Sequence, residues 1–202
     1  MSEKSSLVPL TVIRHGPTDW TTDKRLQGRT DIPLSDEGRE MAQTWRVPDD
    51  IVSRAWVCSP LVRTQQTAEI LASKPARVEP RIIEMSYGEW EGFRLPDLRE
   101  ELGDEMAENE AKGLDFRPPG GESPRDVQAR MGPWLVDIGA NGDPVAVVAH
   151  HGIIRALYAL ATGWNMVDRL PQKFRFGEMH HFQVEPSGRI HVERLNESMT
   201  SE

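Results

Sequence analysis

The chain has 202 residues, enough for one domain with a buried core, and 38% of its residues are hydrophobic while 28% are charged. Its formal net charge of −8 disfavours a general nucleic-acid-binding protein, which needs a broad basic face, but allows an anionic small-molecule substrate. No stretch has the apolar length of a membrane span, residues 1–6 lack signal-peptide features and Cys58 has no disulfide partner, so we expect a cytoplasmic protein.

Apolar runs rich in β-forming residues alternate with helical patterns, which is typical of βαβ units around a mostly parallel sheet. A polar loop is expected between the first strand and residue 31, and Ser35 is a good N-cap for the helix that follows. The elements expected in the first half are strands at 10–13, 55–58 and, more weakly, 81–83, and helices at 35–45 and 59–73.

Residues 84–121 form the least regular segment, and we expect them to be an inserted lid with short helices at 95–102 and 105–111. Helices are then expected at 123–138 and 154–162, a buried central strand at 145–149, and a hairpin at 181–184 and 189–193. Residues 195–202 are expected to fray. With no internal repeat, residues 1–202 are predicted to form one domain, with 95–120 as its lid or insertion.

Two of the expected strands end in histidine and glycine. Arg14-His15-Gly16 follows the first strand, and His150-His151-Gly152 follows the central one. Ligands of open α/β sheets bind just beyond the carboxyl ends of the strands, so these residues are predicted to share a crevice.

The residue types in this crevice favour phosphoryl chemistry. Arg14 and Arg63 are suited to binding phosphate oxygens, and a neutral imidazole such as that of His15 can attack phosphorus to form a covalent phosphohistidine. A leaving alkoxide needs a proton, and Glu84 is the best candidate donor. Glu89 and Glu91 are rivals that the sequence does not separate from Glu84.

A metal site is the main alternative, because His150-His151 and His180-His181 are pairs of possible ligands. Adjacent strand residues point to opposite faces, however, and no carboxylate follows at ligand spacing, so we expect no metal and no cofactor. His150 is then interpreted as a packing residue, and His180 as a core residue or a substrate contact.

Three further arginines lie near these motifs. Arg25 and Arg29 are interpreted as solvated loop charges, one of which could reach a second anionic group. Arg155 is expected to brace its helix rather than bind substrate.

A set of motifs, in order between about residues 10 and 185, resembles the histidine phosphatase superfamily, the phosphoglycerate mutase-like proteins. The motifs are Arg14-His15-Gly16-Pro17-Thr18, Gln27-Gly28, Pro33-Leu34-Ser35 to Gly38, Ser59-Pro60 to Arg63, Gln66-Thr67-Ala68, Glu84 with Gly88-Glu89-Trp90-Glu91-Gly92, Gly121-Glu122-Ser123 and His151-Gly152.

The resemblance implies a three-layer α/β/α sandwich around a mostly parallel sheet with one antiparallel strand. It implies that His15 is the phosphate-accepting nucleophile and that Glu84 is the proton donor. By the same resemblance Arg14, Arg63 and His151 form the phosphate pocket, and Gln27 and Gly28 lie at the mouth of the substrate site.

The chain departs from the family pattern at Pro17, where many members have Glu or Gln, and at Thr21, where mutases usually have Asn. The segment between Glu84 and His151 is also too short for the insertion with which glycolytic mutases exclude water.

We therefore expect a phosphatase acting on a small phosphorylated metabolite, with mutase-type transfer or non-catalytic binding of a phosphorylated ligand as alternatives. The loop at 95–120 is expected to select among esters such as sugar phosphates, ribazole phosphate and phosphoglycerates. No sequence feature marks an oligomer interface.

Overall fold

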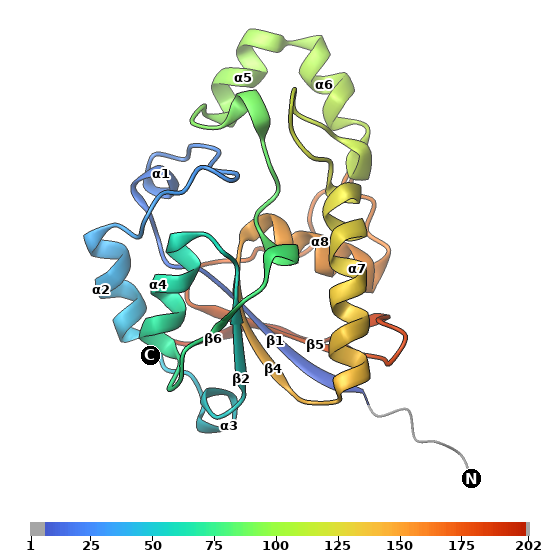
Figure 1. Cartoon of the computed structure of the whole chain (residues 1–202). Coiled ribbons are helices and arrows are strands. Elements are labelled where there is room, and N and C mark those ends of the chain that lie inside the picture. The colour runs from blue at the N-terminus through green and yellow to red at the C-terminus, as the bar shows by residue number, and fades with distance from the viewer. Residues whose placement is uncertain (1–6, 201–202) are drawn as a thin grey trace.

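The computed structural model describes residues 7–200 and has a six-stranded sheet in the order β3-β2-β4-β1-β5-β6 (Figure 1). Its strands are β1 (Val8–Arg14), β2 (Ala55–Cys58), β3 (Arg77–Val78), β4 (Val145–Ala149), β5 (Glu178–Val184) and β6 (Ile190–Ser198). The pairs β1–β4, β2–β4 and β2–β3 are parallel, whereas β5 is antiparallel to both β1 and β6. The prediction of a mostly parallel sheet with one antiparallel strand is confirmed.

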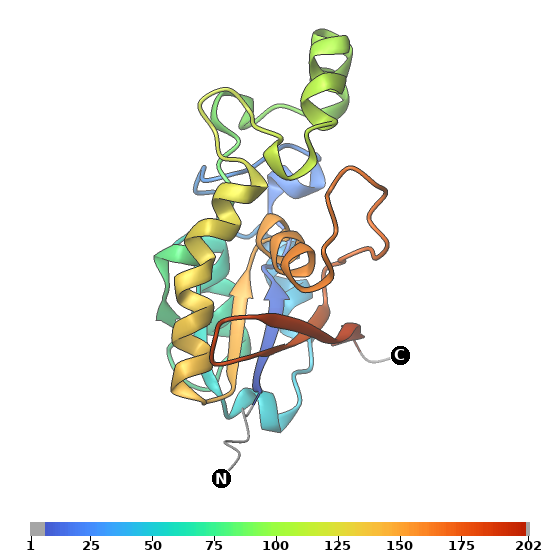
Figure 2. The same ribbon diagram turned by 90° about the vertical axis from the view of Figure 1, so that its right-hand side faces the viewer.

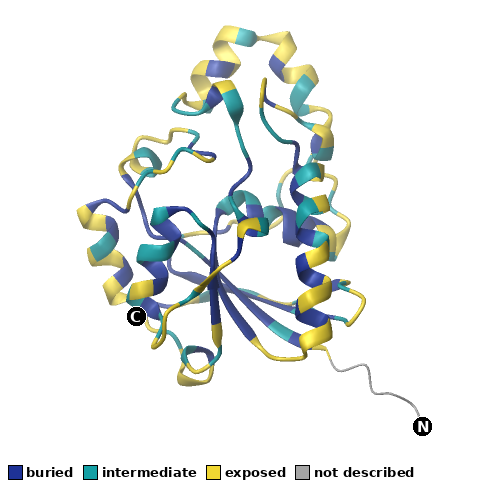
Figure 3. Cartoon of the chain, in the orientation of Figure 1, coloured by how far each residue is buried: buried dark blue, intermediate teal, exposed yellow. Residues whose placement is uncertain are grey.

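Helices cover both faces of the sheet, because successive strand residues point in opposite directions. Val12 and Val147 belong to a core cluster with helices α7 (Pro124–Asn141) and α8 (His151–Thr162). Ile13 and Val148 belong to a second cluster, with the helices of the other face. Those helices are α2 (Asp36–Thr44), α3 (Asp49–Val52) and α4 (Val62–Leu71). Figure 3 shows the resulting layers, with buried strands between helices that expose only their outer sides.

The segment predicted as a lid projects beyond the carboxyl ends of β1 and β4 (Figure 2). It contains α5 (Leu95–Leu102) and α6 (Asp104–Glu110), close to the helices expected at 95–102 and 105–111. Trp90, Leu98 and Met106 form a small core of their own there. The segment therefore packs as a separate layer above the sheet edge where the histidines were expected.

Two predictions about secondary structure were wrong: the strand at 81–83 and the fraying of the chain from residue 195. Residues 80–82 form a 3₁₀ helix rather than a strand, because Pro80 has no N–H for a ladder and Glu79 caps the turn by accepting from the Arg81 N–H at 3.1 Å. Residues 195–198 do not fray but continue β6, and Glu197 lies within 2.7 Å of His181 on the neighbouring strand. Residues 201 and 202 of the expected tail lie outside the described residues.

Smaller differences concern helix starts. The polar loop before residue 31 contains the short helix α1 (Asp19–Thr22), and α8 begins at His151 rather than at residue 154. None of the helices within residues 7–200 is long and apolar enough to span a membrane.

Candidate active site

His15 lies directly beyond β1, and its backbone N–H donates to the Ala149 carbonyl at the end of β4 at 3.0 Å. The parallel register pairs Ile13 with Val148 and Arg14 with Ala149, so the next residues, His15 and His150, are neighbours. Their ring centroids are 5.3 Å apart. The sheet therefore brings together the two histidine-bearing strand ends, as the sequence predicted.

The tautomer of His15 follows from its hydrogen bond to the Gly16 carbonyl, which lies 2.7 Å from Nδ1. A carbonyl oxygen only accepts, so the proton is on Nδ1 and the Nε2 lone pair is free. Burial lowers the pKa of His15 well below its usual value, and the neighbouring Arg63 and Arg14 guanidiniums lower it further. His15 is thus a neutral imidazole with Nε2 available as a nucleophile.

Two arginines flank His15. Arg14 lies over the Phe176 ring, with its guanidinium carbon 3.9 Å from the ring centroid, and burial lowers its pKa to about 10. Arg63 donates to the carbonyls of Gly28 at 2.8 Å and Thr30 at 3.0 Å, which fix the orientation of its guanidinium. Within the described part of the chain, the buried Nε atoms of both arginines lack a hydrogen-bond partner. The Nε–H group of each arginine is therefore available to donate a hydrogen bond to a bound anion.

Glu84 is buried beside the start of α8, and its carboxylate oxygens accept from the backbone N–H groups of Met85 at 2.8 Å and Gly152 at 3.2 Å. Gly152 leaves room for this carboxylate, because a Cβ atom at that position would lie 2.5 Å from Glu84 Oε1. Burial raises the pKa of Glu84 above its usual value, against the opposing effect of these two hydrogen bonds and of the arginines. Such a carboxyl is suited to give and take a proton.

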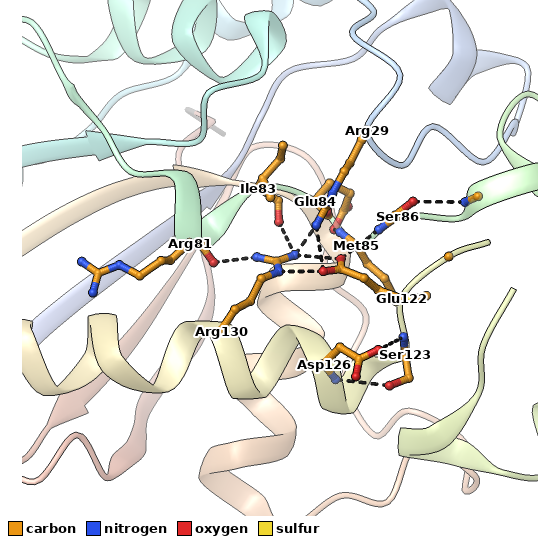
Figure 4. Close-up of polar contacts among 12 residues, drawn as sticks. Arg29, Arg81, Ile83, Glu84, Met85, Ser86, Glu122, Ser123, Asp126 and Arg130 are labelled. Carbon is orange, nitrogen blue, oxygen red and sulfur yellow. Dashed lines mark hydrogen bonds and ion pairs between the residues drawn. The ribbon is translucent and has the colours of Figure 1, made fainter.

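Arg130 of α7 holds the backbone around Glu84 in place by hydrogen bonds (Figure 4). Its guanidinium donates to the carbonyls of Arg81 and Ile83, both at 2.6 Å, and to that of Glu84 at 3.3 Å. Glu122 joins the cluster by accepting from Arg130 at 3.1 Å and from Arg29 at 2.7 Å. Arg29 is exposed, as expected for a loop charge, and it also joins its loop to Glu122 through this ion pair.

The structure separates Glu84 from its two rivals. Glu89 is exposed. Glu91 accepts from the backbone N–H groups of Arg29 and Thr30, both at 2.9 Å, and of Tyr87 at 3.1 Å, so it joins two loops. Neither has the buried position next to the arginines that Glu84 has.

His150, which the sequence analysis treated as a packing residue, lies deeper in the site than His151. Its Nε2 is 2.7 Å from the Ser59 hydroxyl, while its buried Nδ1 has no partner among residues 7–200. Ser59 Oγ also accepts from the Leu61 N–H at 3.3 Å, so its own hydrogen can bond His150 Nε2 and leave the proton of His150 on Nδ1.

His151 is the first residue of α8 and half-buried, with its ring against Phe174 at 6.4 Å between centroids. Burial, with Arg14 and Arg155 nearby, lowers its pKa to about 3. The alternation of strand residues is the signal that distinguishes the two histidines, because it gives His15 and His150 the same face.

The predicted mouth residues lie next to Arg63. Gly28 has a φ of +52°, and a Cβ there would collide with Glu91, so its carbonyl reaches Arg63 in a conformation that favours glycine. Gln27 is buried, and within the described residues its Oε1 has no partner. Thr21 uses its hydroxyl to donate to the Thr18 carbonyl at 2.8 Å, so this hydroxyl helps to cap α1.

The remaining basic and imidazole groups lie elsewhere. Arg25 donates to Asp23 at 3.3 Å and to the Gly92 carbonyl at 2.9 Å. His180 accepts from the Asn196 N–H at 3.2 Å and packs on Phe174. In the part of the chain that the structure describes, no group of three or more His, Cys, Asp or Glu could hold a metal ion.

Comparison with known proteins agrees with this geometry. Residues 10–197 match the model of the histidine phosphatase superfamily, branch 1. The chain is similar to glucosyl-3-phosphoglycerate phosphatase of Mycobacterium tuberculosis, with 34% identity over 74% of this chain and 73% of the relative. It is also similar to 2,3-bisphosphoglycerate-dependent phosphoglycerate mutase 2 of Gloeobacter violaceus, with 29% identity over 73% of each chain.

A solved structure of mycobacterial glucosyl-3-phosphoglycerate phosphatase superposes with a TM-score of 0.77 at 26% identity, covering 97% of this chain and 100% of that one.

Proposed function

The chain belongs to the histidine phosphatase superfamily, and from this premise we propose that it hydrolyses small phosphomonoesters through a phosphohistidine at His15. The observation that carries the proposal is the set of buried, unpartnered nitrogens on side chains that neighbour His15. They are Arg14 Nε, Arg63 Nε and His150 Nδ1, counted among the described residues. Leaving such groups buried and unpaired is costly, and a tetrahedral anion bound next to His15 would satisfy them together.

In the first step of the proposed reaction, His15 Nε2 attacks phosphorus while the bond to the leaving oxygen breaks. Glu84 gives its proton to that oxygen from its protonated form, which burial favours by raising the pKa. Arg14 and Arg63 stabilise the charge on the non-bridging oxygens. The products are a free alcohol and phospho-His15, with Glu84 now ionised.

In the second step water attacks the phosphorus of phospho-His15. Glu84 accepts a proton from the attacking water, and the bond between phosphorus and Nε2 breaks to return neutral His15 and inorganic phosphate. Each group thus ends the cycle as it began. Because the charges are supplied by arginines, the scheme has no step that uses a metal ion.

We assign the second imidazole of the phosphate pocket to His150 rather than to His151. Three observations support the assignment. His150 is a neighbour of His15 through the strand register, its Nε2 is bonded to Ser59, and its buried Nδ1 has no partner among residues 7–200. The Nδ1–H of His150 would donate to a phosphate oxygen, leaving His151 to shape the wall of the site.

Hydrolysis is favoured over mutase-type transfer by Thr21. Mutases usually carry an asparagine at this position, whereas the Thr21 hydroxyl is bonded to the backbone of Thr18. The short segment between Glu84 and His151 also favours access of water.

The test is release of inorganic phosphate from an aryl phosphate, which we expect to be abolished by His15→Ala and unaffected by a chelator. Incubation with 3-phosphoglycerate should give phosphate rather than 2-phosphoglycerate. Turnover that persists in His15→Ala would overturn the proposal, and formation of 2-phosphoglycerate would instead support a mutase.

A further inference from the structure

A cavity of about 290 Å³ adjoins Glu84 beneath the helices α5 and α6. Met85 and Gly152 line it, and these are the residues whose N–H groups bind the Glu84 carboxylate. The carboxyl that would protonate the leaving oxygen is therefore hydrogen-bonded to the backbone of two residues of the cavity wall. A leaving oxygen protonated by Glu84 would therefore lie close to this cavity.

Eight of the thirteen residues that line the cavity have apolar side chains. Two of its charged side chains, Arg99 of α5 and Glu110 of α6, bond to each other at 2.7 Å and so neutralise one another. A cavity of about 150 Å³ is sufficient to bind benzene, so this one has room for one or two rings. The apolar side chains that define it are Leu26, Leu95, Phe116, Val127, Met166 and Val167.

Arg155 is the exception in this lining. It lies on α8, four residues after His151, with its guanidinium carbon 5.2 Å from the centre of the Trp164 ring. Its buried Nε has no hydrogen-bond partner, and the side chain forms no ion pair, within residues 7–200. Arg155 is half-buried, and its buried Nε, a donor that the described residues leave unsatisfied, would pair with an anionic group of a ligand in the cavity.

From these contacts we propose that the substrate is the phosphomonoester of a largely apolar, ring-sized alcohol that carries one anionic group, and that Arg155 binds this group. The proposal rests on the phosphatase function proposed above. It reverses the expectation that Arg155 only braces its helix.

The same lining disfavours polyhydroxylated leaving groups. Beyond Arg155 and the paired Arg99 and Glu110, Tyr87 is the polar side chain that the cavity presents. Sugar hydroxyls buried against the apolar side chains would lose their hydrogen bonds to water without replacement. A carboxylated ring buries no hydroxyl, and its carboxylate is paired with Arg155.

Three esters of primary alcohols test the proposal at matched leaving-group chemistry: 4-carboxybenzyl phosphate, benzyl phosphate and glucose 6-phosphate. We expect kcat/KM to fall in that order. Arg155→Met should lower the ratio of kcat/KM for 4-carboxybenzyl over benzyl phosphate by about tenfold or more, since a charge-assisted hydrogen bond is lost. The matched control is Arg169→Met, which removes an exposed charge that does not line the cavity and should leave the ratio unchanged.

The outcomes separate the two proposals. His15-dependent turnover in which glucose 6-phosphate equals or exceeds benzyl phosphate would overturn the apolar leaving group while sparing the phosphatase. An unchanged ratio in Arg155→Met, or an equal loss for both benzyl esters, would overturn the role of Arg155. Absence of His15-dependent turnover for all three esters would overturn both proposals.

Discussion

Replacing Glu84 by Gln removes the proposed proton donor while keeping the shape of the side chain. The carboxylate accepts two backbone N–H groups, and an amide keeps one acceptor oxygen but turns its NH₂ toward the other N–H. Losing one buried hydrogen bond costs about 1–3 kcal/mol of the free energy of unfolding. Typical domains are stable by about 5–15 kcal/mol, so we expect the variant to fold.

The kinetic effect of Glu84→Gln should depend on the leaving group. Benzyl alcohol leaves poorly without a proton, so the first step with benzyl phosphate should slow by about a hundredfold to ten-thousandfold, the usual contribution of general acid catalysis. 4-Nitrophenolate leaves as an anion, so phosphorylation of His15 by 4-nitrophenyl phosphate should change little. Dephosphorylation also needs Glu84, as the base for water, and should become slow with either ester.

Stopped-flow absorbance with 4-nitrophenyl phosphate measures this directly. Glu84→Gln should release a burst of one equivalent of nitrophenolate per enzyme, followed by slow turnover. Thermal unfolding of the variant controls for misfolding. If the variant slows the first step equally for both esters, Glu84 is not the proton donor.

The other predictions concern the neighbours of Glu84 and the pH profile. His150→Ala should lower kcat/KM by about a hundredfold to a thousandfold, as the loss of one transition-state donor does, whereas His151→Ala should cost far less; the reverse order would return the pocket role to His151. Gly152→Ala places a Cβ 2.5 Å from Glu84 Oε1 and should lower kcat/KM by about a hundredfold with little change in Tm; wild-type activity would contradict the contact. For pH, activity requires neutral His15, whose pKa is lowered, and protonated Glu84, whose pKa is raised. With benzyl phosphate, whose leaving group needs the proton, kcat/KM should therefore persist below pH 6.5 and fall as the pH rises through the pKa of Glu84, and this basic limb should be absent from the profile of Glu84→Gln.

Much of the site could be predicted because it is built on strand ends. Arg14, His15 and the histidines after β4 follow apolar runs, and the carboxyl ends of adjacent parallel strands meet at one edge of a sheet. Arg63 could be predicted because it lies early in the helix after β2. The places of these residues at the sheet edge follow from the apolar runs that precede them in the sequence and from the parallel pairing of the strands.

The parts that could not be predicted depend on tertiary contacts. Glu84, Glu89 and Glu91 lie close together in the sequence, and what separates them is burial against Gly152 and the loop contacts of Glu91. The choice between His150 and His151 depends on where β4 ends and α8 begins, and the sequence analysis placed that start three residues too late. The continuation of β6 was missed because its pairing with β5 shifts register around His181.

The most direct test of the account is to identify the phosphorylated residue. The enzyme is quenched during turnover of a phosphorus-labelled aryl phosphate, and its peptides are analysed by mass spectrometry. We expect a single acid-labile, base-stable phosphoryl group on His15, which accumulates in Glu84→Gln and is absent from His15→Ala. Label on another residue, or undiminished turnover with no label on His15, would contradict it.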